Sequence, residues 1–213
     1  MVFVARRKEK LQEIFDLIQD FNRDCFAFPA DISKEEEVNA LFREILCKYG
    51  RIDILINNAG RGLKAGLCDT SYADWIDIMN ANLNGVFLCT RAAVKNMREQ
   101  ESKGHIITVS SIVGRFGAPQ HAAYSASKHG VTGFTKSLWW ELLRCGIKVS
   151  TIHPARVDTD FFTSYPKKPS RNQMVQPEDI AHLLVALSKG SFFEIGWVRL
   201  RNTYKRIRNA ILL

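Results

Sequence analysis

Short runs of β-branched and aromatic residues alternate along the chain with longer stretches whose apolar residues recur at i, i+3 and i+4. The short runs cover residues 2–5, 25–28, 52–57, 105–110, 148–153 and 197–200. The longer stretches have the period of a helix with one buried face, whereas the short runs have the composition of strands. Because strands and helices that alternate in this way form βα units, the pattern predicts an α/β fold. We expect a doubly wound parallel sheet as the middle of three layers.

The second helical stretch carries a start signal in the segment "DISKEEEV". Ser33 precedes a run of glutamates and is expected to be the N-cap. Glu36, three residues further on, completes the pattern of a capping box, in which side chains and backbone N–H groups satisfy one another. The helix is therefore predicted to begin directly after Ser33.

Length and composition predict one domain. The chain has 213 residues, 46% of them hydrophobic and 24% charged, with no break in composition that would separate two domains. We expect a single domain over residues 1–201 and a basic tail over 202–213. The net charge is +8, and no acidic residue follows Glu194. No nucleic-acid recognition motif accompanies the tail, so a solvated surface explains it better and no nucleic-acid partner is expected.

Several other classes of protein find no support in the sequence. No apolar run approaches the roughly 18 residues of a spanning helix, and the N-terminus lacks the pattern of a signal peptide. We therefore expect a cytoplasmic protein without a membrane partner. The five cysteines are scattered and never spaced as CxxC. Neither a disulfide framework nor a metal site is expected from them.

The stretch "AAYSASKHG" places Tyr124 and Lys128 four residues apart. Residues i and i+4 share one face of a helix, so the phenol and the ammonium are expected to lie side by side. A neighbouring ammonium lowers the pKa of a tyrosine toward the range where it exchanges protons near neutrality. The small residues 125–127 are expected to leave the approach to the pair open. Taken alone, the same spacing also describes an ordinary half-exposed helix surface.

Further polar residues stand where predicted strands end. Ser111 follows one strand, thirteen residues before Tyr124, and its hydroxyl is placed to bond a substrate oxygen. The segment "ILINNAG" ends another strand with Asn57 and Asn58, followed by two small residues that let a flat ligand approach the backbone. Asn82 lies inside a predicted helix, where asparagine usually needs a local hydrogen-bonding reason. These positions predict a site at the carboxyl edge of the sheet.

The motifs "NNAG", "NLNG" and "YSASK", with a serine thirteen residues before the tyrosine, together resemble the short-chain dehydrogenase/reductase (SDR) family. The resemblance covers residues 2–201. It implies a Rossmann-like fold and an enzyme that reduces a ketone, or oxidises a secondary alcohol, by hydride transfer with a nicotinamide cofactor.

The resemblance also implies a catalytic tetrad. Tyr124 would be the proton donor to the carbonyl oxygen. Lys128 would lower the pKa of that tyrosine and bind the nicotinamide ribose. Ser111 would orient and polarise the substrate oxygen, and Asn82 would hold a water molecule in the proton relay. Family members are commonly dimers or tetramers, so a homodimer or homotetramer is expected, and Trp139 and Trp140 would suit such an interface or the core.

The resemblance implies cofactor contacts as well. After the first strand, members that prefer NAD have an acidic residue, whereas this chain has Ala5 followed by Arg6 and Arg7. Arginines at that place suit the 2′-phosphate of NADP, although two arginines also suit a solvated helix start. We therefore expect NADP. The other contacts implied are Asp31, Ile32, Asn58, Ala59, Gly60, Tyr124, Lys128, Pro154, Val157 and Thr159.

The sequence departs from the family pattern in two places. Ala155 follows Pro154 where the family usually has glycine, and a positive φ there would cost on the order of 1 kcal/mol. The glycine-rich phosphate turn is missing, since the first glycine is Gly50. The first, central strand is then missing too, between the strands at 2–5 and 52–57. Either those two strands pair directly, or an upstream segment of roughly 30 residues, the size of a βαβ unit with its glycine-rich turn, supplies the missing strand.

Two functions from different classes remain open. One is an NADP-dependent oxidoreductase. The other is a catalytically inactive binding or scaffold protein that keeps the family core without the phosphate loop. The substrate also stays open. One segment combines three aromatic residues with three basic ones, namely Phe161, Phe162, Tyr165, Lys167, Lys168 and Arg171. It suits an apolar ketone, or an acidic acyl carrier protein as in 3-oxoacyl-carrier-protein reductases, or simply a solvated loop.

Overall fold

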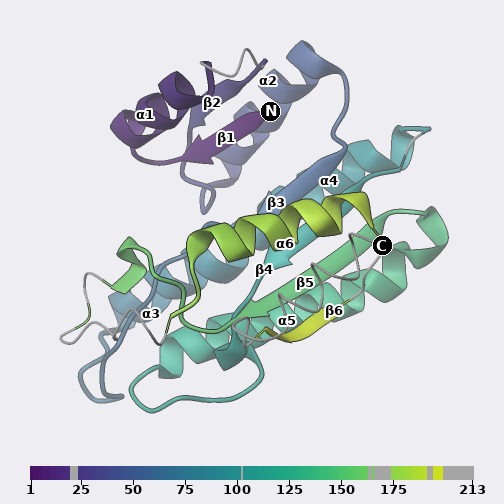
Figure 1. Cartoon of the computed structure of the whole chain (residues 1–213). Coiled ribbons are helices and arrows are strands. Elements are labelled where there is room, and N and C mark those ends of the chain that lie inside the picture. Colours follow the sequence, from purple (N-terminus) through teal and green to yellow (C-terminus); the bar gives the residue numbers. More distant parts are fainter. Residues whose placement is uncertain (20–23, 102, 163–164, 166–173, 191–193, 199–213) are drawn as a thin grey trace.

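The fold is seen in a computed structural model of the chain (Figure 1). The structure describes residues 1–19, 24–101, 103–162, 165, 174–190 and 194–198, the last of these as backbone only. The expected tail at 202–213, and the basic residues Lys167, Lys168 and Arg171, lie outside the described residues.

Strands and helices alternate as the hydrophobic pattern predicts. The strands are β1 (Val2–Ala5), β2 (Phe26–Pro29), β3 (Ile54–Asn57), β4 (His105–Val109), β5 (Lys148–Pro154) and β6 (Glu194–Val198). The helices are α1 (Lys8–Gln19), α2 (Glu35–Tyr49), α3 (Tyr72–Met79), α4 (Gly85–Glu99), α5 (Ala122–Leu142) and α6 (Pro177–Lys189). Short π-helical and 3-10 turns at Asn80–Asn84 and Ile112–Gly114 precede α4 and α5 respectively. The largest deviation is β6, which begins at Glu194, three residues before the predicted run.

All strand pairs are parallel, but they form two separate sheets. β1 pairs with β2, and the second sheet has the order β3-β4-β5-β6 (Figure 1). No ladder joins β1 to β3 in the described part of the chain, so the direct pairing of these strands that we considered does not occur. The break lies where the doubly wound order places the missing central strand, and it leaves Ile54 and Ile56 of β3 41% and 44% exposed.

Helices cover both faces of the strands. The period-2 alternation of a strand sends Ile106 and Val149 toward α2, α4 and α5, and sends Ile107 and Ile152 toward α6. All four of these side chains are buried. Val2 and Val4 of β1 pack against the larger of the two clusters, so the small sheet shares a core with the larger one. The arrangement is the three-layer αβα fold that the sequence predicts.

The predicted capping box of α2 is wrong. The N-cap is Lys34, which makes no side-chain cap bond. The hydroxyl of Ser33 donates instead to the carboxylate of Asp31 at 2.7 Å, and Glu37, not Glu36, accepts the backbone N–H of Asp31 at 2.7 Å. The side chains therefore stabilise the turn after β2 and not the first turn of the helix.

A pair of glycines tests how tightly the fold holds the start of α5. A Cβ at Gly114 would lie 2.7 Å from the carbonyl oxygen of Lys128, whereas a Cβ at Gly133 would meet nothing within 4 Å. Gly114→Ala is therefore expected to lower the free energy of unfolding by about 1–3 kcal/mol. Gly133→Ala, in the interior of α5, is expected to raise it by about 0.5–1 kcal/mol. Urea unfolding followed by circular dichroism measures both, and equal effects would contradict the packing described.

Candidate active site

Tyr124 and Lys128 lie side by side on the first turns of α5, as the four-residue spacing predicts. The amine nitrogen of Lys128 is 6.0 Å from the centroid of the Tyr124 ring. Lys128 is only 5% exposed, and its Nζ donates a hydrogen bond of 3.0 Å to the carbonyl of Val109 at the end of β4. This bond fixes the lysine between its own helix and the carboxyl edge of the sheet.

Ser111 joins the pair from the segment that follows β4. Its side chain lies close enough to the phenol of Tyr124 to lower the pKa of that phenol, so the fold brings together the two groups that the sequence placed thirteen residues apart. The same hydroxyl accepts the backbone N–H of Val113 at 3.3 Å, and the carbonyl of Ser111 is 3.2 Å from Nδ1 of His153. Ser111 is therefore anchored from β5 as well as from its own turn.

The expected fall in the pKa of Tyr124 is not found in the chain without a bound cofactor. Burial raises the pKa of Tyr124 to about 12, against the opposing effect of the hydrogen bond from Ser111. Burial also lowers the pKa of Lys128 to about 8. The prediction was wrong because it treated the two groups as exposed, whereas desolvation disfavours the charged form of both. Tyr124 is accordingly a neutral phenol with a proton to give.

Asn82 ties the loop after β3 to α5. It lies in the π-helical turn Asn80–Asn84 and is fully buried. Its Oδ1 accepts the backbone N–H of Arg61 at 2.8 Å, while its Nδ2 donates to the carbonyl of Arg61 and to Oγ of Ser127, both at 3.0 Å. The local reason that an asparagine needs inside a helix is thus a set of tertiary hydrogen bonds.

The small residues between Tyr124 and Lys128 do not line an open approach, as the sequence suggested. Ser125 and Ser127 are buried. Ser127 accepts from Asn82 and donates to the carbonyl of Tyr124 at 2.7 Å, so it is a structural link that sequence reasoning missed. Its place three residues after the tyrosine was the only local signal, because the asparagine it binds is 45 residues away.

The segment after β3 reaches the same site. A Cβ at Gly60 would lie 3.1 Å from Oδ1 of Asn82 and 3.7 Å from Nζ of Lys128, so the glycine allows both side chains to approach the backbone. Asn58 and Ala59 precede it and are exposed. Asn57 points the other way, since it is buried and donates to Oγ1 of Thr90 at 3.0 Å.

Four of the predicted cofactor residues lie just after the ends of β1 and β2. Arg6 follows β1, and its guanidinium is 3.8 Å from the carboxylate of Asp31, which follows β2. Burial opposes ionisation of Asp31, but hydrogen bonds from Ser33 and the charge of Arg6 hold its pKa below the usual value. Arg7 is exposed, and Ile32 contacts Gly85 at the start of α4.

The remaining predicted residues follow β5. Pro154 is the buried last residue of that strand, and Val157 forms a single parallel bridge with Val175. Thr159 is exposed, and its hydroxyl accepts the backbone N–H of Phe161 at 3.3 Å. Among the described residues other than glycine, only Gln120 has a positive φ. Ala155 therefore carries none of the strain that a positive φ would impose.

Aromatic rings lie close to Tyr124. The ring of Phe161 is 5.5 Å from that of Tyr124, and the ring of Tyr165 is 6.1 Å from that of Phe161. Both approach Gly62 so closely that a Cβ there would lie 2.5 Å from Phe161 and 2.6 Å from the hydroxyl of Tyr165. We call Phe161, Phe162 and Tyr165 the aromatic cap.

The fold and this cluster of serine, tyrosine and lysine define an oxidoreductase of the Rossmann-like αβα type. The chain belongs to the short chain dehydrogenase family, which matches residues 1–170. It is 33% identical over 203 residues to an uncharacterized oxidoreductase of Staphylococcus aureus (strain MRSA252), covering 94% of this chain and 85% of that protein. It is also 37% identical over 163 residues to a 3-oxoacyl-[acyl-carrier-protein] reductase of Synechocystis sp., covering 74% of this chain and 66% of the relative.

Solved structures have the same fold. A 3-ketoacyl-(acyl-carrier-protein) reductase from Brucella melitensis, complexed with NADH, superposes with a TM-score of 0.83 at 29% identity, over 91% of this chain and 84% of the other. An alcohol dehydrogenase from Thermococcus sibiricus, complexed with 5-hydroxy-NADP, gives a TM-score of 0.82 at 24% identity, over 91% and 83%. In the described part of this chain, no helix is long and apolar enough to cross a membrane, and no cluster of potential metal ligands occurs.

Burial of Lys128 predicts a specific dependence of stability on pH. Its pKa is about 8 in the folded chain and 10.5 ordinarily, so between these values the unfolded chain binds more protons and the free energy of unfolding rises with pH. We expect this contribution, isolated as wild type minus Lys128→Met, to grow by about 2–3 kcal/mol between pH 8 and 10. Urea unfolding across this range measures it. Lys136→Met, which changes an exposed lysine on the same helix, is the control, and a flat difference for Lys128→Met would refute the burial.

Proposed function

We propose that this chain uses NADP to reduce the carbonyl of a ketone, or to oxidise the corresponding secondary alcohol, with Tyr124 exchanging the proton. The observation that carries the proposal is the buried phenol of Tyr124, which lies near the hydroxyl of Ser111 and whose pKa burial raises to about 12. Lys128 lies beside it. Membership of an oxidoreductase family supports the same reaction, and so does a related structure, 29% identical, that is named as a complex with NADH.

Some of the residues present fit the cofactor. Arg6 and Arg7 are exposed cations at the end of β1, and the loose 3.8 Å pairing of Arg6 with Asp31 leaves a guanidinium for the 2′-phosphate of NADP. We assign Gly60, with Tyr124 and Lys128, to the nicotinamide and its ribose, and Asp31 and Ile32 to the adenine. No glycine precedes Gly50, so this chain offers no glycine-rich turn for the pyrophosphate.

The chain's own residues then account for the proton. When bound, the nicotinamide supplies or accepts the hydride. Ser111 donates a hydrogen bond to the carbonyl oxygen, and Tyr124 donates its proton to the same atom. The phenolate left behind is stabilised by the ammonium of Lys128. Both N–H groups of Asn82 are engaged, and we assign the remaining lone pair of its oxygen to the water molecule that returns a proton to this site.

The aromatic cap favours a ketone with an apolar substituent. The ring of Phe161 is tilted by 57° against that of Tyr124, with the centroids 5.5 Å apart, and a substrate carbonyl next to the phenol places its substituents near this ring. Relatives named 3-oxoacyl-[acyl-carrier-protein] reductases support an acyl ketone as one such substrate. Glycine at 62 is required for the cap, so Gly62→Ala, with a Cβ 2.5 Å from Phe161, should displace it.

We expect Gly62→Ala to raise KM for acetoacetyl-N-acetylcysteamine at least tenfold, because the displaced cap no longer holds the acyl group. The value of kcat should change less than threefold. Steady-state kinetics with NADPH measures both constants. Gly117→Ala, where a Cβ meets nothing within 4 Å, is the matched control. An unchanged KM for Gly62→Ala would show that the cap takes no part in substrate binding.

We also infer that the chain forms a homodimer or homotetramer. Trp139 packs against the core, whereas Trp140 is 71% exposed on α5 and Leu143 just beyond it is 52% exposed. Such large apolar side chains at the surface, together with Phe87 of α4, which is 42% exposed, are typical of an interface.

The break between β1 and β3 favours a second candidate, an inactive binding or scaffold protein. The two candidates differ in cofactor binding, which does not require turnover. Titration of NADPH against the purified chain, followed by thermal stabilisation, separates them. If NADPH raises the melting temperature and Arg6→Gln weakens this effect, the oxidoreductase is supported. If millimolar NADPH does not raise the melting temperature, the scaffold is supported.

Replacement of the proposed proton donor tests the chemistry. Tyr124→Phe removes only the hydroxyl, and we expect kcat to fall by roughly 100- to 10,000-fold, the range typical of a lost general acid. The affinity for NADPH should change less than threefold. Tyr72→Phe, at a tyrosine that is 79% exposed, is the control. Activity of Tyr124→Phe within tenfold of the wild type would rule out the proton-donor role.

A further inference from the structure

A second tyrosine, Tyr165, lies in the aromatic cap near the proposed proton donor. Its ring is 6.1 Å from the ring of Phe161, which in turn is 5.5 Å from the ring of Tyr124. The two phenols also influence one another. Burial raises the pKa of Tyr124 to about 12, and the electrostatic effect of Tyr165 adds to this increase. Tyr165 therefore belongs to the same site, although the proposed proton transfer does not use it.

The hydroxyl of Tyr165 approaches the loop after β3. A Cβ at Gly62 would lie 2.6 Å from this hydroxyl, and a Cβ at Gly60 would lie 3.7 Å from Nζ of Lys128. Two residues of chain span at most about 7 Å, so the hydroxyl and the ammonium approach neighbouring parts of one short backbone segment. A molecule of a few heavy atoms can therefore reach Tyr165 while its carbonyl lies at the catalytic residues.

The ring of His121 packs against that of Tyr165. The two centroids are 5.7 Å apart and the rings are tilted by 57°. Nδ1 of His121 is 2.7 Å from the carbonyl of Pro119, and because a carbonyl can only accept, this nitrogen is the donor. His121 directly precedes α5, and its imidazole is held by its own backbone. Tyr165 therefore has a well-positioned neighbour from the helix that carries Tyr124.

The hydroxyl of Tyr165 has no hydrogen-bond partner among the described residues. Burial raises the pKa of Tyr165, and no hydrogen bond contributes to this shift. The residue is nevertheless partly exposed, so a ligand can reach it. Polar groups that lose hydration are normally paired, and a donor that the chain leaves unpaired beside its catalytic residues suits an acceptor on the substrate.

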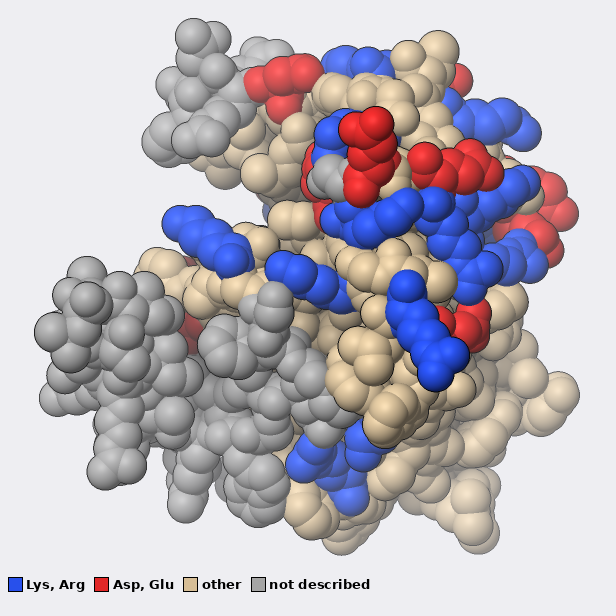
Figure 2. Space-filling view, turned by 90° about the vertical axis from the view of Figure 1, so that its right-hand side faces the viewer, with Lys and Arg blue, Asp and Glu red and all other residues tan. Residues whose placement is uncertain are grey.

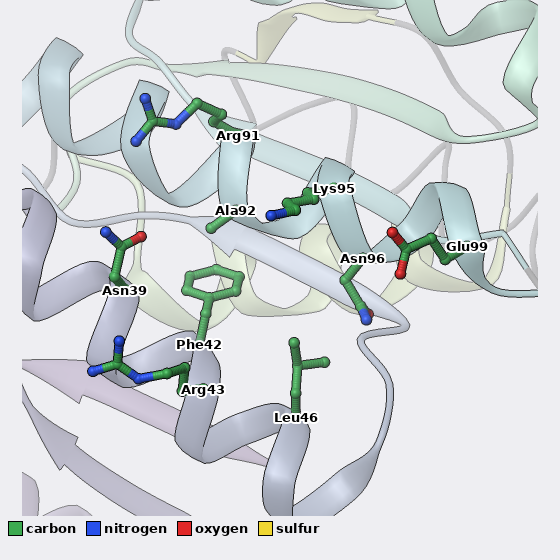
Figure 3. A pocket seen from close by; sticks show the side chains of 9 residues that line it. All are labelled: Asn39, Phe42, Arg43, Leu46, Arg91, Ala92, Lys95, Asn96 and Glu99. Carbon is green, nitrogen blue, oxygen red and sulfur yellow. The ribbon is translucent and has the colours of Figure 1, made fainter.

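Other polar side chains differ from Tyr165 in this respect. Figure 2 shows the face at the amino ends of the strands, where Lys and Arg lie beside Asp and Glu. Lys48 and Asp24 form an ion pair of 3.4 Å on that side. Oδ1 of Asn96 finds no partner in the described part of the chain, but almost none of its surface is accessible, and Figure 3 shows the side chain pointing from α4 toward Leu46. Tyr165 combines the lack of a partner with access from the site.

We propose that Tyr165 determines substrate specificity by donating a hydrogen bond to a second carbonyl group of the substrate. The preferred substrate is then a ketone with another carbonyl a few bonds away, such as a 3-oxo ester or thioester, and not a plain alkyl ketone. A neutral carbonyl suits the site better than a carboxylate, because Phe161 and Phe162 pack against Tyr165 and an unpaired charge is costly beside apolar rings. This role rests on the proposed reduction at Tyr124.

Two substrates of equal chain length test this role. Ethyl 3-oxobutanoate has the second carbonyl, and 2-heptanone lacks it. We expect Tyr165→Phe, which removes only the hydroxyl, to lower kcat/KM for the ester about fivefold to tenfold and for 2-heptanone less than about threefold. Steady-state kinetics with NADPH measures both constants. The greater intrinsic reactivity of the 3-oxo ester cancels, because each substrate is compared between variant and wild type.

Tyr49→Phe is the matched control, since it also removes one phenol hydroxyl. That hydroxyl bonds Asp24 at 3.4 Å, on the amino side of the sheet, and its loss should leave the ratio of the two kcat/KM values unchanged.

Binding gives a readout that requires no turnover. Both ligands are titrated into the ¹⁵N-labelled full chain with NADP⁺, which has no hydride to give. Ethyl 3-oxobutanoate should shift the amide signals of residues 60–62 and 121–124 and bind about fivefold more tightly than 2-heptanone. Tyr165→Phe should remove this preference.

The outcomes separate this role from the proposed function. Turnover of both ketones with an unchanged ratio in Tyr165→Phe would contradict only the role of Tyr165, and so would equal affinity of the wild type for the two ligands. A preference in binding that depends on Tyr165, without any turnover, would contradict the proposed reduction and leave the hydrogen bond from Tyr165 in place. Failure to bind either ligand would overturn both.

Discussion

The buried amide of Asn82 is the interaction on which the candidate site depends. Through it, the loop after β3, the π-helical turn before α4 and the first turn of α5 are held to one another. The carbonyl of Tyr124, bonded to Ser127, belongs to the same network. A hydrogen-bonded side chain in a low-dielectric interior is directional, so this network fixes the orientation as well as the position of the elements. The tyrosine is presented to the carboxyl edge of the sheet by its neighbours and not by its own helix alone.

Burial determines the chemistry of the site. Lys128 and Tyr124 each lose hydration, and each is shifted toward its neutral form. An ammonium beside a phenol does not by itself make a phenolate, because the cost of desolvating both charges competes with their attraction. Burial therefore favours the neutral phenol, which is the protonation state that the proposed reduction of a carbonyl requires.

Much of this was accessible from the sequence, and the limits have physical causes. The strand and helix periods, and the four-residue spacing of Tyr124 and Lys128, depend on local geometry, and the structure confirms them. The links from Ser127 to Asn82 and from Lys128 to Val109 join segments that are 45 and 19 residues apart, and no local pattern encodes them. The prediction of a capping box for α2 was wrong for a related reason, because the hydroxyl of Ser33 hydrogen-bonds the carboxylate of Asp31 instead of capping the helix.

The open edge of β3 has a consequence for the behaviour of the chain in solution. Ile54 and Ile56 stand half exposed on a strand whose outer backbone groups have no partner strand in the described sheets. A short β-branched strand with a free edge is a template for intermolecular pairing, and natural proteins normally cover, shorten or charge such an edge. Pairing of molecules through β3 would therefore act against the mutual repulsion that a net charge of +8 provides in solution.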